Sequence, residues 1–267
     1  MKTFKIRASA CGSIMAGNVG LSEPQQKKLK TFQDKVKAGK ELTALQAAEN
    51  DKLIGILNNP PLPAGLKTFC QKWRKEKIYK RRKEFRSKYT DKGNFCENQS
   101  IEFLNQILLE NWEKCQEYKE NDFLTGTADI VTSDTIIDIK NSWDFDTFPL
   151  YDYGIKNKDY YYQLQCYMEL YDKPKATLAY TLMDAPFHLI EREAKSQCYH
   201  SGIDYKSEEG SAVFHEVRKY MTYRNIDTKY KYKLFHIERD TAVIDKVKER
   251  VAMCQNYINE LVKELEK

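Results

Sequence analysis

The sequence contains no run of about 18 consecutive apolar residues, so a membrane-spanning helix is not expected. Its seven cysteines form no CxxC pair, and its four histidines form no HxxxH pair. These absences argue against a disulfide scaffold, a zinc ribbon, an iron–sulfur cluster and a histidine-ligated zinc site. A reducing cytoplasm is therefore the expected location.

The chain also lacks internal repeats, low-complexity tracts and, in its N-terminal stretch, the leucine-rich segment of a signal peptide. We expect this stretch to belong to the mature protein. With 267 residues, of which 41% are hydrophobic, the chain can bury a sizeable core, and we expect a soluble protein with no membrane partner.

Positive charge is concentrated in one segment, although the net charge is only +5. Acidic residues are few in this segment, and Trp73, Tyr79, Phe85 and Tyr89 interleave with its bases. A solvated helix is the ordinary explanation of such a run, but basic residues among aromatic ones also suit a nucleic acid. The basic residues are Lys72, Arg74, Lys75, Lys77, Lys80, Arg81, Arg82, Lys83, Arg86, Lys88 and Lys92.

Local signals predict an α/β (α+β) fold with a mixed central sheet flanked by helices. Residues 1–90 are expected to form a strand, a loop and a basic helical lobe, and residues 91–267 a core with a helical insertion at about 184–229. Capping patterns at Ser22 and at Thr43 with Gln46 mark two helix starts. The predicted helices are 22–37, 44–57, one from Pro63 through the basic segment, one beginning at Lys92–Gly93, 158–171 and 240–266; the predicted strands lie in 1–20 and at 127–131, 135–140, 176–183 and 230–238.

The stretch Gly126–Ser142 predicts a β-hairpin, because two β-rich runs flank the turn-forming residues 132–134. Side chains alternate along a strand, so Asp138 and Lys140 should share one face and the flanking isoleucines the other. Asp129 lies on the partner strand. Two carboxylates and a lysine at one end of a sheet suit a divalent cation and a positioned ammonium group, although an Asp-Ile-Lys triplet on an exposed strand face is also common.

Three further polar residues accompany the hairpin. Glu97 is expected at the N-terminal end of its helix, where an acid is also favoured simply by the helix dipole. Gln163 and Tyr167 are four residues apart and should share a helix face, although Tyr167 suits a core position equally well.

These elements, in this order, resemble the PD-(D/E)XK nuclease superfamily, in particular the phage lambda-exonuclease-type and YqaJ-like viral recombinase nucleases. The resemblance covers about residues 5–17 and 85–260 and includes the Gly12–Met15 loop and Ile237–Asp240. The matching pattern is Gly93-x-x-x-Glu97-Asn98, Gly126-x-x-Asp129, Asp138-x-Lys140 and Gln163-x-x-x-Tyr167. Two positions depart from the family pattern: Asp138 replaces the usual Glu, and Ala128 replaces the Pro before the first acid.

The resemblance implies a restriction-endonuclease-like core and a Mg²⁺ site, with Mn²⁺ as a substitute. It assigns metal binding to Asp129, Asp138 and the carbonyl of Ile139, and water activation to Lys140. Glu97 would act through water or a second metal ion, and Gln163 would position the lysine or the substrate end. The expected DNA-binding residues are Arg7, Ser9, Ser13, Arg81, Arg82, Lys83 and Tyr167.

The predicted function is a Mg²⁺-dependent exonuclease that digests linear duplex DNA from its ends, in the 5′-to-3′ direction, for phage-type recombination. The resemblance further implies a homotrimeric ring, a single-strand annealing partner and, for a phage protein, the host cytoplasm. Two alternatives stay open: an endonuclease of the same fold, for restriction or repair, and a catalytically silent nucleic-acid-binding protein.

Overall fold

The computed structural model describes residues 3–83 and 87–265, which form two compact units. The helical unit comprises the described residues of Met1–Phe4, Gly12–Arg82 and Lys246–Lys267. The sheet unit comprises those of Lys5–Cys11 and Lys83–Asp245. The units thus interleave along the chain, whereas the sequence analysis placed one boundary at residue 90. No helix of the described residues is long and apolar enough to cross a membrane.

The helical unit begins its helices where the capping signals predict. Helix α2 spans Glu23–Lys37 and α3 spans Ala44–Asn58. The Ser22 amide donates to the side chain of Gln25 at 2.8 Å, and the Thr43 hydroxyl accepts from the Gln46 amide at 3.3 Å. These bonds satisfy amides that the first turn leaves free. The two helices share a small apolar cluster of Leu21, Leu29, Phe32 and Leu53.

Helix α4 spans Ala64–Tyr79, so the predicted helix through the whole basic segment is wrong. It ends because Lys80 adopts the left-handed conformation, with φ of 50°. Arg81, Arg82 and Lys83 follow as exposed, non-helical residues, and Phe85 and Arg86 lie outside the described residues. Trp73 does not offer a free aromatic face either, because its ring packs edge-on against Phe4 at 5.1 Å between centroids.

A four-stranded mixed sheet of order β4-β5-β6-β7 forms the centre of the sheet unit. Strand β5 is antiparallel to β4 and parallel to β6, and β7 is antiparallel to β6. The β4–β5 pair is the predicted hairpin, with a shorter first strand than expected. The strands are β4 Ile130–Val131, β5 Thr135–Asn141, β6 Lys175–Thr181 and β7 Tyr232–Glu238.

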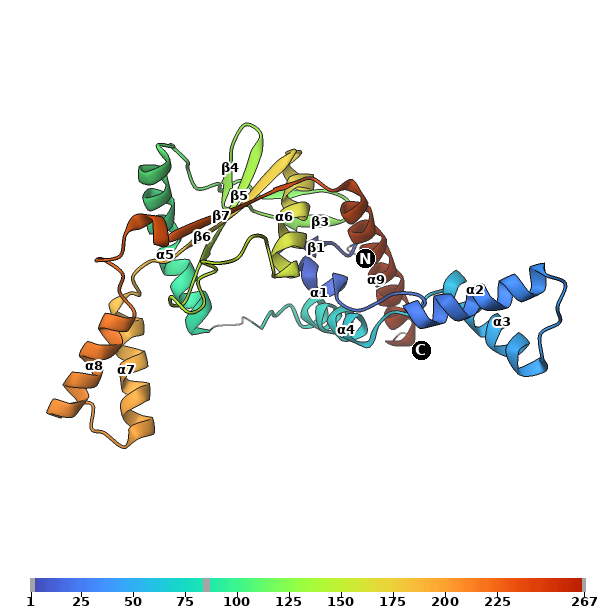
Figure 1. Ribbon diagram of the computed structural model, residues 1–267, viewed down its shortest axis with the longest axis horizontal. Coiled ribbons are helices and arrows are strands. Elements are labelled where there is room, and N and C mark those ends of the chain that lie inside the picture. The colour runs from blue at the N-terminus through green and yellow to red at the C-terminus, as the bar shows by residue number, and fades with distance from the viewer. Residues whose placement is uncertain (1–2, 84–86, 266–267) are drawn as a thin grey trace. The chain divides into compact units, whose positions relative to one another are not determined.

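Helices cover both faces of this sheet (Figure 1). Helix α5, Lys88–Leu108, packs Ile101 and Leu104 against Ile137 and Ile139 of β5. Helix α6, Lys158–Tyr171, joins β5 to β6 and contacts the opposite face through Gln163. Because side chains alternate along β5, the isoleucines face α5 and Asp138 faces α6.

The start of α5 differs from the prediction, because Lys92 and Gly93 lie inside the helix and not at its beginning. Ser87 is the N-cap and exchanges hydrogen bonds with Thr90. Lys92 is fully buried, and its ammonium group donates to the carbonyls of Ser142 and Trp143, both at 2.8 Å. Two acceptors 50 residues away offset the cost of burying this charge.

The remaining elements surround this core. A second, three-stranded sheet has the order β1-β3-β2. The region predicted as a helical insertion contains the paired helices α7 and α8, which lie side by side in Figure 1. The bounds are β1 Ile6–Arg7, η1 Ala8–Ala10, α1 Cys11–Met15, β2 Lys119–Glu120, β3 Leu124–Gly126, α7 Phe187–Ser201, α8 Glu208–Tyr220, η2 Thr228–Tyr230 and α9 Thr241–Leu265.

Candidate active site

Asp138 and Lys140 lie on the same face of β5, as the alternation predicts. Asp138 is 1% exposed, and its Oδ2 forms an ion pair with the Lys140 ammonium group, whose side chain is 21% exposed. This oxygen has no hydrogen-bond partner of good geometry among the described residues. A buried carboxylate oxygen held by one lysine contact can still accept a cation.

Asp129 lies directly opposite Asp138. The register pairs Ile130 with Ile137, so the residue before Ile130 faces the residue after Ile137. Asp129 Oδ2 accepts a hydrogen bond from the Ile139 amide at 2.7 Å, which fixes the carboxylate across the hairpin. The hairpin therefore brings the two acids together, as the sequence indicates.

The electrostatics of the pair reflect this crowding. Burial, the charge of Asp138 and the charge of Glu97 together raise the pKa of Asp129 to about 7. Lys140 and the Ile139 amide oppose the shift without cancelling it. Burial alone would lower the pKa of Lys140, but the two aspartates outweigh it, so that pKa is raised and the group stays an ammonium ion at neutral pH.

Gln163 holds the other oxygen of Asp138. Its Nε2 donates to Asp138 Oδ1 at 2.8 Å and lies 3.4 Å from the Tyr167 hydroxyl. Both side chains are buried on α6. Burial, with the charge of Asp138, raises the pKa of Tyr167, so its phenol stays protonated. The predicted common face of Gln163 and Tyr167 is confirmed, and it points at the acids.

Gly126 is required by the close approach of α6. A Cβ at this position would lie 3.0 Å from Tyr167 Cε1 and 3.4 Å from the Ala8 side chain. The backbone of β3 therefore packs directly against the Tyr167 ring. This contact gives a physical reason for the glycine in the Gly126-x-x-Asp129 pattern.

Glu97 is near Asp129 but not where the sequence analysis placed it. Helix α5 begins at Lys88, so Glu97 lies well inside the helix and cannot be explained as a first-turn acid. Its carboxylate forms an ion pair with Lys114 at 2.9 Å. Among the described residues no group of three His, Cys, Asp or Glu side chains forms a ready-made metal site. Asp129 and Asp138 are the two carboxylates that face each other at this site.

The expected DNA-binding residues are spread over both units. Arg7 on β1 and Ser9 in η1 are exposed in the sheet unit, where η1 packs on α6. The positive charge of Arg7 partly opposes the rise in the pKa of Tyr167, so Arg7 lies near the site. Ser13, Arg81 and Arg82 are exposed residues of the helical unit. Lys83 is exposed in the sheet unit.

Sequence reasoning missed Tyr160 and Tyr180. The Lys140 ammonium group lies 4.9 Å from the centroid of the Tyr160 ring, which packs edge-on against Tyr180 at 6.4 Å. Tyr180 pairs with Lys140 across β5 and β6. Tyr160 could have been found from the sequence, because it precedes Gln163 by three residues and therefore lies on the same side of the helix, about one turn away.

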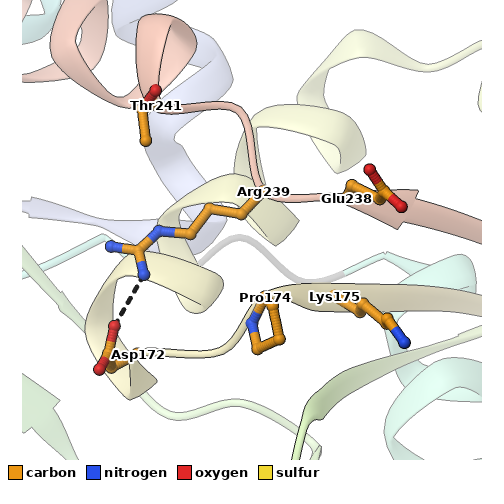
Figure 2. A pocket seen from close by; sticks show the side chains of 6 residues that line it. All are labelled: Asp172, Pro174, Lys175, Glu238, Arg239 and Thr241. Atoms are coloured by element: carbon orange, nitrogen blue, oxygen red, sulfur yellow. Dashed lines mark hydrogen bonds and ion pairs between the residues drawn. The ribbon is translucent and has the colours of Figure 1, made fainter.

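An open pocket of about 430 Å³ lies away from these residues, at the start of β6 and the end of β7. Figure 2 shows Arg239 reaching across it to Asp172, an ion pair of 2.7 Å. Arg239 also pairs with Glu169. Its charge is thus satisfied internally, and neither Asp129 nor Asp138 lines this pocket. The candidate site is the Asp129–Asp138–Lys140 face and not this depression.

Comparison with solved structures supports the fold. A phage-related exonuclease from Haemophilus somnus 129PT matches with a TM-score of 0.67 at 23% identity, covering 99% of this chain and 97% of that chain. An alkaline exonuclease from Laribacter hongkongensis, also solved in complex with dAMP, matches with a TM-score of 0.57 at 10% identity, covering 98% and 91%. No family model and no curated protein matches the sequence. The chain therefore has the fold of these exonucleases, a mixed α/β fold of the kind that the sequence analysis expected.

Proposed function

We propose that the chain is a metal-dependent deoxyribonuclease that removes nucleotides from the ends of linear duplex DNA in the 5′-to-3′ direction. The observation that carries this proposal is the convergence of Asp129, Asp138 and Lys140 on one face of a fold shared with two exonucleases. Phosphodiester hydrolysis needs a positioned water, neutralised phosphate oxygens and a stabilised leaving oxygen, and this set can supply all three with a divalent cation.

The residues present fit Mg²⁺. Asp129 and Asp138 face each other at the end of the hairpin, and burial together with the charge of Asp138 raises the pKa of Asp129, so a cation between the two acids would offset the cost of ionising both. Mg²⁺ binds few protein carboxylates and keeps several waters, so two acids and the Ile139 carbonyl suffice. Mn²⁺ would be accepted by the same oxygens. The chemistry supplied by such an ion, when bound, is charge neutralisation and water activation.

Lys140 then acts through its charge. Its raised pKa keeps the group protonated, so it is poised to stabilise negative charge on the attacking water or on the phosphate and not to remove a proton. Its position is fixed by Asp138 on one side and by the Tyr160 ring on the other.

Gln163 on α6 and Glu97 on α5 would both contribute to this centre. The bond from Gln163 to Asp138 fixes one carboxylate oxygen, so its amide positions Asp138. Glu97, paired with Lys114, adds negative charge toward Asp129 and would contact a metal ion through water or bind a second one.

The proposed substrate end is a 5′-phosphate, with Arg7 and Ser9 of the sheet unit as its binding residues. Ser13, which belongs to the helical unit, is a separate candidate for DNA contact. Arg81, Arg82 and Lys83 would contact the DNA. Tyr167, which the sequence analysis also expected to bind DNA, is buried against Gly126 and would support Gln163 instead. A recombination role with a single-strand annealing protein, in the host cytoplasm for a phage protein, belongs to the same proposal and rests on the family resemblance.

Digestion of a linear duplex with and without 5′-phosphates, in Mg²⁺ or EDTA, tests this function. We expect Mg²⁺-dependent release of nucleotides, faster from phosphorylated ends, and no attack on a covalently closed circle. Asp138→Asn should abolish release, because a neutral amide oxygen binds the cation much more weakly than a carboxylate and cannot form an ion pair with Lys140. Cutting of the closed circle by the wild type would favour the endonuclease alternative, and binding without any cleavage would favour the silent DNA-binding protein.

A further inference from the structure

A second pocket, of about 290 Å³, lies in the sheet unit between the β5–α6 connection and the sheet. The connection supplies its polar rim and strands β6 and β7 supply its aromatic floor. Its principal lining residues are Asp146, Phe148, Asp152, Asn157, Tyr180 and Phe235.

This pocket adjoins the proposed catalytic centre through aromatic side chains. The Lys140 ammonium group lies over the Tyr160 ring, the Tyr160 ring packs against Tyr180, and Tyr180 packs edge-on against Phe235 at 5.9 Å. Burial raises the pKa of Tyr180, and the charges of Asp138 and Asp152 add to the shift. The Tyr180 hydroxyl is therefore close enough to interact electrostatically with Asp138 of the hairpin and with Asp152 of the pocket.

The charged residues that line the pocket indicate which kind of ligand it could bind. Asp146 and Asp152 line it with a single base, Lys156, which pairs with Asp152 Oδ1 at 2.5 Å. This balance disfavours a phosphate group. The described residues offer no cluster of three metal-binding side chains here either. Aromatic walls with carboxylate and amide groups at the rim instead suit a flat, neutral ring that carries hydrogen-bond donors.

We propose that this pocket binds the nucleobase next to the scissile phosphate and that Asp152 accepts a hydrogen bond from the exocyclic amino group of that base. The inference rests on the proposed nuclease function and adds a base preference to it. A carboxylate can accept several hydrogen bonds, so the contact with Lys156 leaves capacity for a base. Cytosine presents an amino donor, whereas thymine presents a carbonyl in the same place and would be disfavoured.

Release of the terminal nucleotide under single-turnover conditions tests the preference. Linear duplexes that differ only in a terminal cytosine or thymine would be compared for the wild type, Asp152→Asn and Asp152→Ala. Asp159→Asn, an exposed acid in the first turn of α6, is the matched control. We expect the wild type and the control to release cytosine about fivefold faster or more, as one charge-assisted hydrogen bond allows.

Asp152→Ala should bring the cytosine-to-thymine ratio close to one, and Asp152→Asn should shift it toward thymine, because its amide donates to the thymine carbonyl. Equal rates for both bases in an active wild type, or a preference that both variants keep, would overturn the pocket assignment while leaving the nuclease function intact.

Saturation-transfer NMR with deoxycytidine and thymidine tests the pocket without catalysis. If the wild type cleaves no DNA, selective saturation of deoxycytidine that Asp152→Asn loses would still support the pocket, and its absence would refute it.

Discussion

Lys140 is the residue on which the charge balance of the site depends. It contacts Asp138 directly and lowers the pKa of Asp129, so one ammonium group partly neutralises two acids. A lysine cannot bind a metal cation, because its nitrogen is protonated and carries no lone pair. Its contribution should therefore appear in the chemical step.

Lys140→Ala should lower kcat by roughly 10²-fold or more, the usual effect of removing one electrostatic group from a transition state. Binding of Mg²⁺, measured by calorimetry, should persist, because both carboxylates remain and a competing positive charge is lost. Lys158→Ala, an exposed lysine at the start of α6, is the control and should leave both quantities unchanged. Loss of metal binding by a folded Lys140→Ala protein would contradict the assigned role.

The pKa of Asp129 predicts a pH-dependent stability of the metal-free protein. Its folded value of about 7 exceeds the ordinary value of 3.8, so between these pH values the folded state keeps a proton that the unfolded chain has released. Stability from this group is present below about pH 4 and is lost as the pH rises to about 7. Asp129→Asn, which cannot ionise, should be more stable than the wild type by on the order of 1–3 kcal/mol at pH 8 and lose that advantage toward pH 4.

Thermal unfolding in EDTA across this pH range measures the difference, with Asp159→Asn as the exposed-acid control. Adding Mg²⁺ at pH 8 should stabilise the wild type and not Asp129→Asn. A stability difference that does not change with pH would show that Asp129 is not protonated in the folded, metal-free state.

At the scale of elements, the site depends on the packing of α6 on β3. The Tyr167 ring occupies the space in which a Gly126 side chain would stand, and the same helix carries Gln163 to Asp138. A displacement of this helix would therefore loosen the carboxylate as well as the core.

Gly126→Ala should destabilise the protein by about 1–3 kcal/mol, because its methyl group overpacks the Tyr167 contact, and should lower activity. Denaturant unfolding and nuclease assays measure both effects. Gly93→Ala is the control: Gly93 lies inside α5 with no atom within 4 Å of a Cβ, so alanine should stabilise by about 0.5–1 kcal/mol. Destabilisation by Gly93→Ala would contradict a continuous helix at that position.

The basic segment after α4 makes a separate prediction. Arg81, Arg82 and Lys83 are exposed and outside any helix, so they are free to follow a phosphate backbone. Replacing all three with alanine should weaken DNA binding and reduce the slope of log K against log salt by up to about 0.9 per lost phosphate contact. The control replaces Lys27, Lys30 and Lys35 of α2 with alanine, which removes the same amount of charge at another place. If both triple variants gave the same slope, the effect would come from net charge and not from contacts of the basic segment with phosphates.

At the scale of the whole molecule, we expect three copies of the chain to close into a ring. The resemblance to phage exonucleases implies this assembly, and three-fold closure would place the basic residues of every copy around a shared channel. Light scattering should give about three times the mass of the 31.4 kDa chain, and digestion of a long duplex in the presence of competitor DNA should be processive. A monomer that dissociates after each cleavage would contradict the ring.

The sequence by itself determined the local features of this protein. The hairpin and the shared face of Asp138 and Lys140 follow from the two-residue period of a strand, which no distant contact can change without breaking the sheet. The bounds of α6, and the caps at Ser22 and Thr43, likewise depend on residues within one helical turn. Asp129 opposite Asp138 follows from the hairpin register alone.

Tertiary structure decided what depends on distant partners. The helix predicted to begin at Lys92–Gly93 begins earlier, at Lys88. Glycine inside a helix costs about 1 kcal/mol, which is small beside the bonds from Lys92 to two carbonyls of the β5–α6 connection. Those acceptors lie 50 residues away, so no local pattern could reveal that Lys92 is buried. The mid-helix position of Glu97, in contrast, follows from the local cap at Ser87, which the sequence analysis missed. The aromatic contacts of Lys140 and the pocket beside it arise in the same way, from segments joined only when β5, α6 and β6 pack together.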